Sequence, residues 1–213
     1  NEPRIANTAL GCIGLAVCWD VAHRDMWQDY RGRVDAVVLV SAPPRFHRAV
    51  VNFPLGRKVY LAELWPELLR RREELDRWYR EDVGRCAAVL GAPIVSAMLG
   101  GRFVSALPLP RLSFWAVAFA RPRYWAWGAQ AAQATVRATF YGASALWDGQ
   151  GNLLAAVAGE EGAAVADLPA AGEPGAGSDF LPAVPPSLRV LEAAFRPLAA
   201  VYRRGRRTQS NHE

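Results

Sequence analysis

The chain has 213 residues, of which 52% are hydrophobic and 21% are charged, and its formal net charge is +5. This size and composition predict one domain, or one domain with an appendage, with enough apolar residues for a sizeable core. No uninterrupted apolar stretch reaches the roughly 18 residues that a membrane-spanning helix needs, which excludes such a helix within this sequence.

The first hundred residues alternate between strand and helix patterns. Strands are expected over residues 13–17, 36–40 and 93–98, and a short helix over residues 24–30. Residues 64–90 predict an amphipathic helix or a broken pair of helices, because apolar residues recur there at steps of three and four. The run at 13–17 is short, apolar and bounded by glycine, as is typical of a parallel sheet covered on both faces. The predicted class is therefore α/β.

Residues 102–137 interrupt this alternation with many aromatic residues, broken by arginines and prolines. The segment could be a lid or wall of an apolar substrate pocket, or a subunit interface, where aromatic residues and arginine are enriched. We favour a third interpretation, in which it packs as a helical pair on its own domain. Four tryptophans outside it, at 27, 65, 78 and 147, are expected in the core.

The last third of the chain contains a predicted hairpin and an appendage. The hairpin pairs residues 138–147 with 153–158 around the turn at 148–151, and residues 163–167 follow it as a closing strand. Residues 169–186 are rich in Ala, Gly and Pro and predict a linker, and 187–213 predict a C-terminal helix with a basic tail. A basic tail can contact nucleic acid or acidic lipid, but we favour a solvated end and expect neither partner.

Cysteine and histidine are sparse and scattered. The cysteines lie at positions 12, 18 and 86 without Cys-x-x-Cys spacing, and the histidines at 23, 47 and 212. This pattern predicts no metal site and no cofactor. A few unpaired cysteines suit a reducing compartment, where a single thiol can be catalytic, so we predict a cytoplasmic protein.

Cys18 is the main candidate for a reactive side chain. It falls where the predicted strand 13–17 ends, and ligands bind at the carboxyl ends of strands in open α/β sheets. A buried core cysteine is the alternative, because free cysteine is among the most buried residue types.

The surroundings of Cys18 resemble the nucleophile segment of the carbon–nitrogen hydrolase (nitrilase) superfamily. In that family an apolar strand leads into Cys-Tyr-Asp, Cys-Trp-Glu or a similar triplet, and here it leads into Cys18-Trp19-Asp20. Four further segments resemble family motifs in the same order, so that the resemblance covers about residues 10–168. They are residues 23–27, 34–42, 85–95 and 140–167, and relative to this family pattern residues 102–137 resemble an insertion.

The resemblance implies a fold and a set of site residues. The family fold is a four-layer αββα sandwich, of which residues 1–168 would form the second half. Cys18 would be the nucleophile, and the backbone N–H of Trp19 would stabilise the oxyanion. Asp20 would fix the turn by accepting backbone N–H groups or would act on the substrate, and the first role is favoured. His23 could form a Cys–His dyad but is interpreted as pocket wall or surface.

The resemblance also implies residues that this sequence lacks. Family members carry a general-base Glu and an oxyanion-stabilising Lys before the nucleophile, whereas residues 1–17 contain one acid, Glu2, and no lysine. The chain is therefore expected to be the C-terminal part of the domain, or a member that has lost catalysis. Half of a sandwich would leave one sheet face without its covering layer.

Three functions follow from these observations. The first is a hydrolase that cleaves a nitrile, amide or N-carbamoyl compound through a cysteine thioester or thioimidate, acting on a small molecule within a homo-oligomer. The second is a non-catalytic scaffold or regulatory partner with the same fold. The third is the branch of the family that N-acylates lipoproteins. The sequence leaves open whether the chain as given is an active enzyme.

Overall fold

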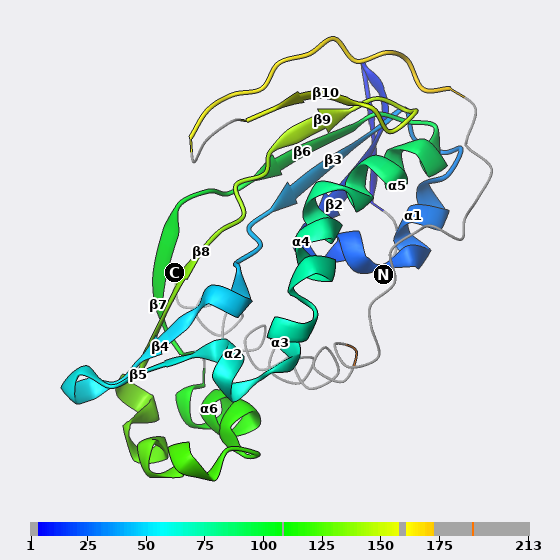
Figure 1. The fold of residues 1–213 in the computed structure, drawn as a ribbon. Helices are drawn as coiled ribbons and strands as arrows, with labels where there is room; N and C mark the ends of the chain where they lie inside the picture. The colour runs from blue at the N-terminus through cyan, green and yellow to red at the C-terminus, as the bar shows by residue number, and fades with distance from the viewer. Residues whose placement is uncertain (1–3, 108, 158–160, 173–188, 190–213) are drawn as a thin grey trace, which may run out of the picture.

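The structure is a computed structural model that describes residues 4–107, 109–157, 161–172 and 189. Most of the predicted linker and the C-terminal helix and tail lie outside these residues. The described chain forms two sheets with separate apolar cores (Figure 1).

The larger sheet has six strands in the order β1-β2-β3-β6-β9-β10. Its strands are β1 (Ile5–Thr8), β2 (Gly11–Val17), β3 (Ala36–Ser41), β6 (Ile94–Met98), β9 (Ala145–Trp147) and β10 (Leu153–Ala156). The three central strands are parallel, since β3 pairs in parallel with both β2 and β6, and the outer strands pair antiparallel. The carboxyl ends of β2, β3 and β6 therefore share one edge of the sheet.

Helices cover one face of this sheet. They are α1 (Arg24–Tyr30), α4 (Arg72–Arg80) and α5 (Asp82–Leu90), which lie on the same side in Figure 1. On that side Ala16, Val37 and Leu39 are at most 1% exposed. Their neighbours along the strands point the other way and remain accessible, with Val17 61% and Val40 53% exposed. The structure thus confirms the predicted α/β class and shows a sheet with one covered and one open face.

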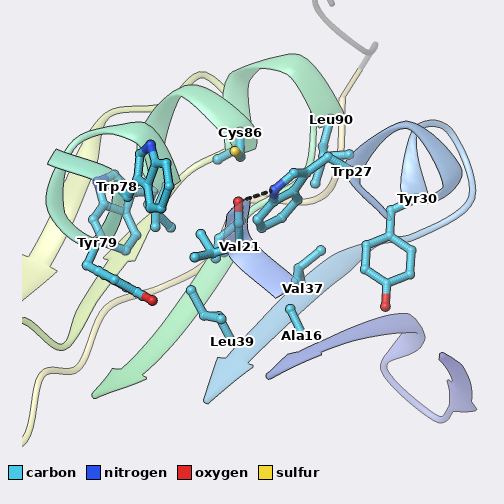
Figure 2. Packing of buried hydrophobic residues seen from close by; sticks show 14 of the residues in the cluster. Ala16, Val21, Trp27, Tyr30, Val37, Leu39, Trp78, Tyr79, Cys86 and Leu90 are labelled. Carbon is cyan, nitrogen blue, oxygen red and sulfur yellow. Dashed lines mark hydrogen bonds between the residues drawn. The ribbon is translucent and has the colours of Figure 1, made fainter. Parts of the chain in front are cut away.

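The core under the helices contains three of the four predicted core tryptophans. Trp27, Trp78 and Trp147 are at most 5% exposed, and Trp65 packs partly buried against the same cluster. Figure 2 shows Trp27 beneath α5, with its indole N–H donating to the carbonyl oxygen of Val21 at 2.9 Å. Because Val21 lies three residues after Cys18, this bond ties the segment after β2 to α1.

The position of α5 against the hairpin of β9 and β10 depends on a close contact between the helix backbone and the hairpin. A Cβ added at Gly84 would lie 2.9 Å from the indole ring of Trp147, so glycine is required for this contact. The helix ends at Gly91, which adopts φ +68° as its C-terminal cap. The turn of the hairpin is held by the Asp148 carboxylate, which accepts the backbone N–H groups of Gln150 and Asn152.

The smaller sheet has four strands in the order β5-β4-β8-β7 and extends away from the larger one (Figure 1). Its strands are β4 (Val50–Asn52), β5 (Lys58–Tyr60), β7 (Arg102–Ala106) and β8 (Thr135–Thr139), with α6 (Pro110–Ala118) and η4 (Pro122–Gln133) packed beside them. The aromatic segment therefore packs with its own sheet. Phe53 lies edge-on to both Phe114 and Trp127, with ring centroids 5.7 and 5.2 Å apart.

Several sequence-based boundaries are corrected by the structure. The segment 102–137 was expected as a helical pair, but it begins with β7 and leads into β8. The expected hairpin strand 138–147 is divided, because its first residues belong to β8 and only Ala145–Trp147 forms β9. Residues 163–167 form no strand. The strands β4 and β5 have three residues each, too few to show a period-two pattern.

The amphipathic segment 64–90 is broken further than expected. It contains the end of α2 (Leu61–Leu64), then α3 (Glu67–Arg70), α4 and α5. Pro66 separates the first two, because proline cannot donate a backbone hydrogen bond within a helix. These breaks let α4 run beside the carboxyl edge of the larger sheet while α5 covers its middle (Figure 1).

We predict that Trp27→Phe lowers the free energy of unfolding by about 1–3 kcal/mol, because it leaves the buried carbonyl of Val21 without a donor. Urea unfolding followed by far-ultraviolet circular dichroism measures this change. Trp125→Phe is the matched control, since Trp125 is 45% exposed and water can replace its indole N–H. Equal midpoints for the two variants would contradict the assignment.

Candidate active site

Cys18 lies at the carboxyl edge of the larger sheet, directly after β2. It is the first residue of the short 3₁₀ helix η1 (Cys18–Ala22), and its φ is +49°. A residue with a Cβ rarely adopts this left-handed backbone, and such strain clusters at functional sites. In α/β-hydrolases a sharp, strained strand-to-helix turn exposes the nucleophilic serine. Cys18 is partly buried and carries a free thiol.

Asp20 holds this turn together. Its carboxylate accepts the backbone N–H of Val17 at 2.9 Å, and its backbone carbonyl accepts the N–H of His23, also at 2.9 Å. The bond from the Val17 N–H is the turn-fixing contact that the sequence predicts for Asp20. It joins the last residue of β2 to the segment that follows Cys18, so it supports the strained backbone between them.

Trp19 and His23 take different positions around the turn. The ring of Trp19 lies edge-on to Trp78 of α4, with centroids 5.7 Å apart. The backbone N–H of Trp19 belongs to the first turn of η1, where N–H groups have no acceptor within the helix. His23 ends η1 and precedes α1.

Tyr79 lies next to Cys18, and the sequence analysis did not single it out. It is on α4 and is 5% exposed. Burial raises the pKa of Tyr79 well above its ordinary value of 10, and the neighbouring thiol raises that pKa further. Figure 2 shows the Tyr79 side chain extending from α4 with its hydroxyl toward the sheet.

A second tyrosine connects Tyr79 to charged groups. Tyr141 stacks at a tilt on Tyr79, with centroids 5.8 Å apart, and its hydroxyl donates to the carboxylate of Asp76. Burial and this carboxylate raise the pKa of Tyr141. The guanidinium of Arg45 lies 5.2 Å from the centre of the Tyr141 ring. A cysteine, two tyrosines, a carboxylate and a guanidinium thus gather at the edge where β2 and β3 end.

The loop after β3 has hydrogen-bonding capacity that the described residues do not use. Nε of Arg45 and Nδ1 of His47 are buried, and neither has a hydrogen-bond partner in the described part of the chain. Burial lowers the pKa of His47, and the nearby arginines lower it further, while Asp76 opposes them. His47 is therefore neutral at physiological pH. Buried polar atoms without partners are uncommon and leave room for a contact with a bound molecule.

The other cysteines differ in environment. Cys86 is fully buried, and burial together with Asp82 raises the pKa of its thiol. Cys12 is partly buried, and its thiol donates to the side-chain carbonyl of Asn7. Neither lies at the carboxyl edge of the parallel strands.

The resemblance implies a general-base Glu and a Lys, and three candidates for these roles among the described residues have other surroundings. Lys58, the single lysine of the sequence, is exposed at the start of β5 in the smaller sheet. Glu63 accepts the hydroxyl of Tyr124 at 2.8 Å, and Glu67 accepts the guanidinium of Arg71 at 2.6 Å. These carboxylates serve contacts within their own region.

The described residues contain no cluster of three or more His, Cys, Asp or Glu side chains that could hold a metal ion. Across the same residues, every helix falls short of the length and apolarity needed to cross a bilayer. The arrangement at Cys18 offers a thiol as nucleophile beside the backbone N–H groups that begin η1. This set suits attack on an electrophilic carbon.

No protein-family model matches the chain, and no curated protein matches it. Solved structures similar to it include a carbon–nitrogen hydrolase from Helicobacter pylori G27, at 18% identity over 72% of this chain with a TM-score of 0.40. They also include an amidase from Nesterenkonia sp. AN1, at 16% identity over 79% of this chain with a TM-score of 0.39. The chain spans 38% and 43% of the lengths of these two structures.

We predict that iodoacetamide modifies Cys18 at least about ten times faster than Cys86 at neutral pH, because burial both shields the Cys86 thiol and disfavours its thiolate. Peptide mass spectrometry over a time course measures both rates in one sample. The Cys86 rate is expected to rise only when pH is high or the chain unfolds. Equal rates in the folded protein would contradict the site.

Proposed function

We propose that the chain is the nucleophile-bearing part of a carbon–nitrogen hydrolase domain and that Cys18 carries the chemistry. The observation that supports this most is the left-handed backbone of Cys18 at the carboxyl edge of three parallel strands. The five sequence segments that resemble the superfamily, and a sheet with helices on one face only, point in the same direction. Sparse free thiols fit action in the cytoplasm.

The proposed reaction is acyl transfer to a thiol. The Cys18 sulfur forms a bond to the carbonyl carbon of an amide or N-carbamoyl compound, the carbon–nitrogen bond breaks, and the nitrogen leaves after taking up a proton. A nitrile gives a thioimidate by addition to the triple bond, and water converts this thioimidate into the thioester with loss of ammonia. Water then cleaves the thioester and restores the thiol. The N–H of Trp19 would donate to the oxyanion, and Asp20 would maintain the turn.

The general base and a cation for the oxyanion would come from a second layer on the open sheet face. That face carries apolar side chains which a single sheet leaves in water, among them Leu15, Val17 and Val40 at 41%, 61% and 53% exposure. Burying them against a matching sheet is favourable by the hydrophobic effect, and sheets pack face to face about 10 Å apart. The covering layer would be another segment of the same protein or a partner copy.

A scaffold function is the second candidate, and the position of Lys58 on the smaller sheet favours it. With the single lysine away from Cys18, the described residues alone do not provide a cation for the oxyanion. The two candidates differ in one property. A hydrolase requires a Cys18 thiol that can be acylated, whereas a scaffold does not.

Acylation by an activated ester separates these candidates. We predict that p-nitrophenyl acetate releases about one equivalent of p-nitrophenol per chain in a burst, followed by slow turnover, because an activated ester needs little help from a base. Cys18→Ala should remove the burst, and Cys12→Ala, which removes another partly buried thiol, should retain it. A burst that survives Cys18→Ala would contradict the role of Cys18, and no burst in the parent chain would favour the scaffold.

We also predict that the 213-residue chain on its own self-associates and releases no ammonia from simple amides or nitriles. The first result follows from the open apolar face, and the second from the absence of a base and a lysine at Cys18. Size-exclusion chromatography with light scattering and an ammonia assay measure both. Val17→Lys together with Val40→Lys should yield more monomer. A monomeric parent chain with Cys18-dependent ammonia release would overturn the need for a second layer.

A further inference from the structure

We propose that α6 and the start of η4 form a surface that docks on an anionic phospholipid membrane. Its centre, here called the aromatic platform, consists of the exposed apolar side chains Leu112, Trp115, Phe119 and Trp125. The platform is a different segment from the basic C-terminal tail, where no lipid contact is expected. It also lies on the smaller sheet, so the inference does not depend on the proposed role of Cys18.

The helix α6 is apolar on two opposite sides. On one side Phe114 and Ala118 are at most 1% exposed and pack into the core of the smaller sheet. On the other side Leu112 and Phe119 lie two helical turns apart at 56% and 73% exposure, with Trp115 between them at 38%. A helix that is apolar on both sides is normally covered on both, and a continuous exposed apolar patch marks an interaction site.

Contacts with η4 hold the exposed rings in place. The ring centroid of Trp125 lies 6.1 Å from that of Trp115 and 6.3 Å from that of Phe119. The indole N–H of Trp125 donates to the carbonyl oxygens of Ala118 and Phe119 at 3.2 and 3.1 Å. Because this N–H already has acceptors within the protein, the ring can enter an apolar environment without leaving a donor unpaired. The platform is therefore formed before it meets a partner.

The charges around the platform have one sign. Residues 83–147 contain six arginines and no Asp, Glu or Lys. Arg111 is exposed in the first turn of α6, where a cation gains nothing from the helix dipole, and Arg121 follows Phe119 by two residues. Exposed tryptophan, phenylalanine and leucine beside arginine are typical of helices that lie in a membrane interface. An anionic lipid surface complements both the apolar side chains and the charge.

A hollow beside the platform offers a place for a lipid headgroup. It has a volume of about 400 Å³ and begins one residue after Phe119, where it is lined by Glu63, Ala120, Arg121, Pro122 and Arg123. Glu63 forms an ion pair with Arg123 at 3.2 Å, so the lining keeps one positive charge in excess. A guanidinium matches the oxygens of a phosphate in geometry as well as charge, so a headgroup phosphate can bind there while Phe119 enters the acyl region.

The position and chemistry of the platform favour lipid over two other occupants. Figure 1 shows α6 at the opposite end of the molecule from β10, so a flat surface can reach it without meeting the larger sheet. Two copies of the chain that met through their platforms would bring arginines together, and like charges oppose such a contact. Single-stranded nucleic acid binds by stacking bases on rings, whereas the exposed side chain of Leu112 offers no ring.

The test is co-sedimentation of the 213-residue chain with phosphatidylcholine vesicles, with and without about 30 mol% phosphatidylserine as the anionic lipid. The parent chain should bind the anionic vesicles, and added salt should weaken the binding. Leu112→Ser together with Phe119→Ser should lower the partition coefficient at least about ten-fold, because two inserting apolar side chains are lost. No binding by the parent chain, or equal binding by this variant, would overturn the inference.

A matched control addresses the open face of the larger sheet, which is also apolar. Val17→Ser together with Val40→Ser removes two side chains of similar exposure, 61% and 53%, and should leave vesicle binding unchanged. A loss of binding in this control would place the contact on the open face and contradict the platform. Fluorescence anisotropy with a labelled single-stranded RNA tests the other polyanion, and RNA binding without vesicle binding would reject lipid as the partner.

A second measurement uses the parent chain and reports which rings enter the bilayer. Lipids with brominated acyl chains quench the fluorescence of tryptophans that contact them, so the parent chain should be quenched in anionic vesicles that contain them. Trp115→Phe together with Trp125→Phe should lose most of this quenching. Unchanged quenching in that variant would contradict the inference. Neither measurement involves Cys18, so these results stay separate from the ester burst that tests the proposed function.

Discussion

The left-handed backbone at Cys18 is the constraint on which the candidate site depends. A side chain at φ +49° costs free energy that Gly would avoid, so the surroundings must impose it. Two features do so. The strand β2 is fixed in register by its parallel pairing with β3, and the Asp20 carboxylate binds the N–H of Val17 just before the turn. The Cys18 thiol lies close enough to Tyr79 of α4 to raise the pKa of that phenol.

The two faces of the larger sheet have different roles in this account. The helical face supplies the core, with Trp27 and Trp78 almost fully buried. The open face supplies an apolar surface and little polar chemistry. An acyl-transfer site needs a base and a cation as well as a nucleophile, and a second layer could supply both groups. The same layer would cover the apolar side chains of the open face.

Sequence patterns predicted the parallel strands of the larger sheet better than the surroundings of Cys18. The strands around 13–17, 36–40 and 93–98 and the helix Arg24–Tyr30 are long enough or bounded clearly enough for periodicity to show. The smaller sheet was missed because β4 and β5 are very short. Tyr79 and Tyr141 were missed because aromatic residues at helical spacing indicate a core, and their contacts come from distant parts of the chain. The spacing of Asp76 and Tyr79 on one helix face was the available signal.

The measurement that tests the central claim most directly compares the unfolding free energies of Cys18→Gly and Cys18→Ala by urea titration. In ordinary backbone, Ala is more stable than Gly by about 0.5–1 kcal/mol, because Gly loses more conformational entropy on folding. If the fold holds position 18 in the left-handed region, the order reverses, and Cys18→Gly is more stable by about 1 kcal/mol. A Cys18→Ala variant that equals or exceeds Cys18→Gly would show that the backbone at Cys18 is not strained, and the account of the site would fail.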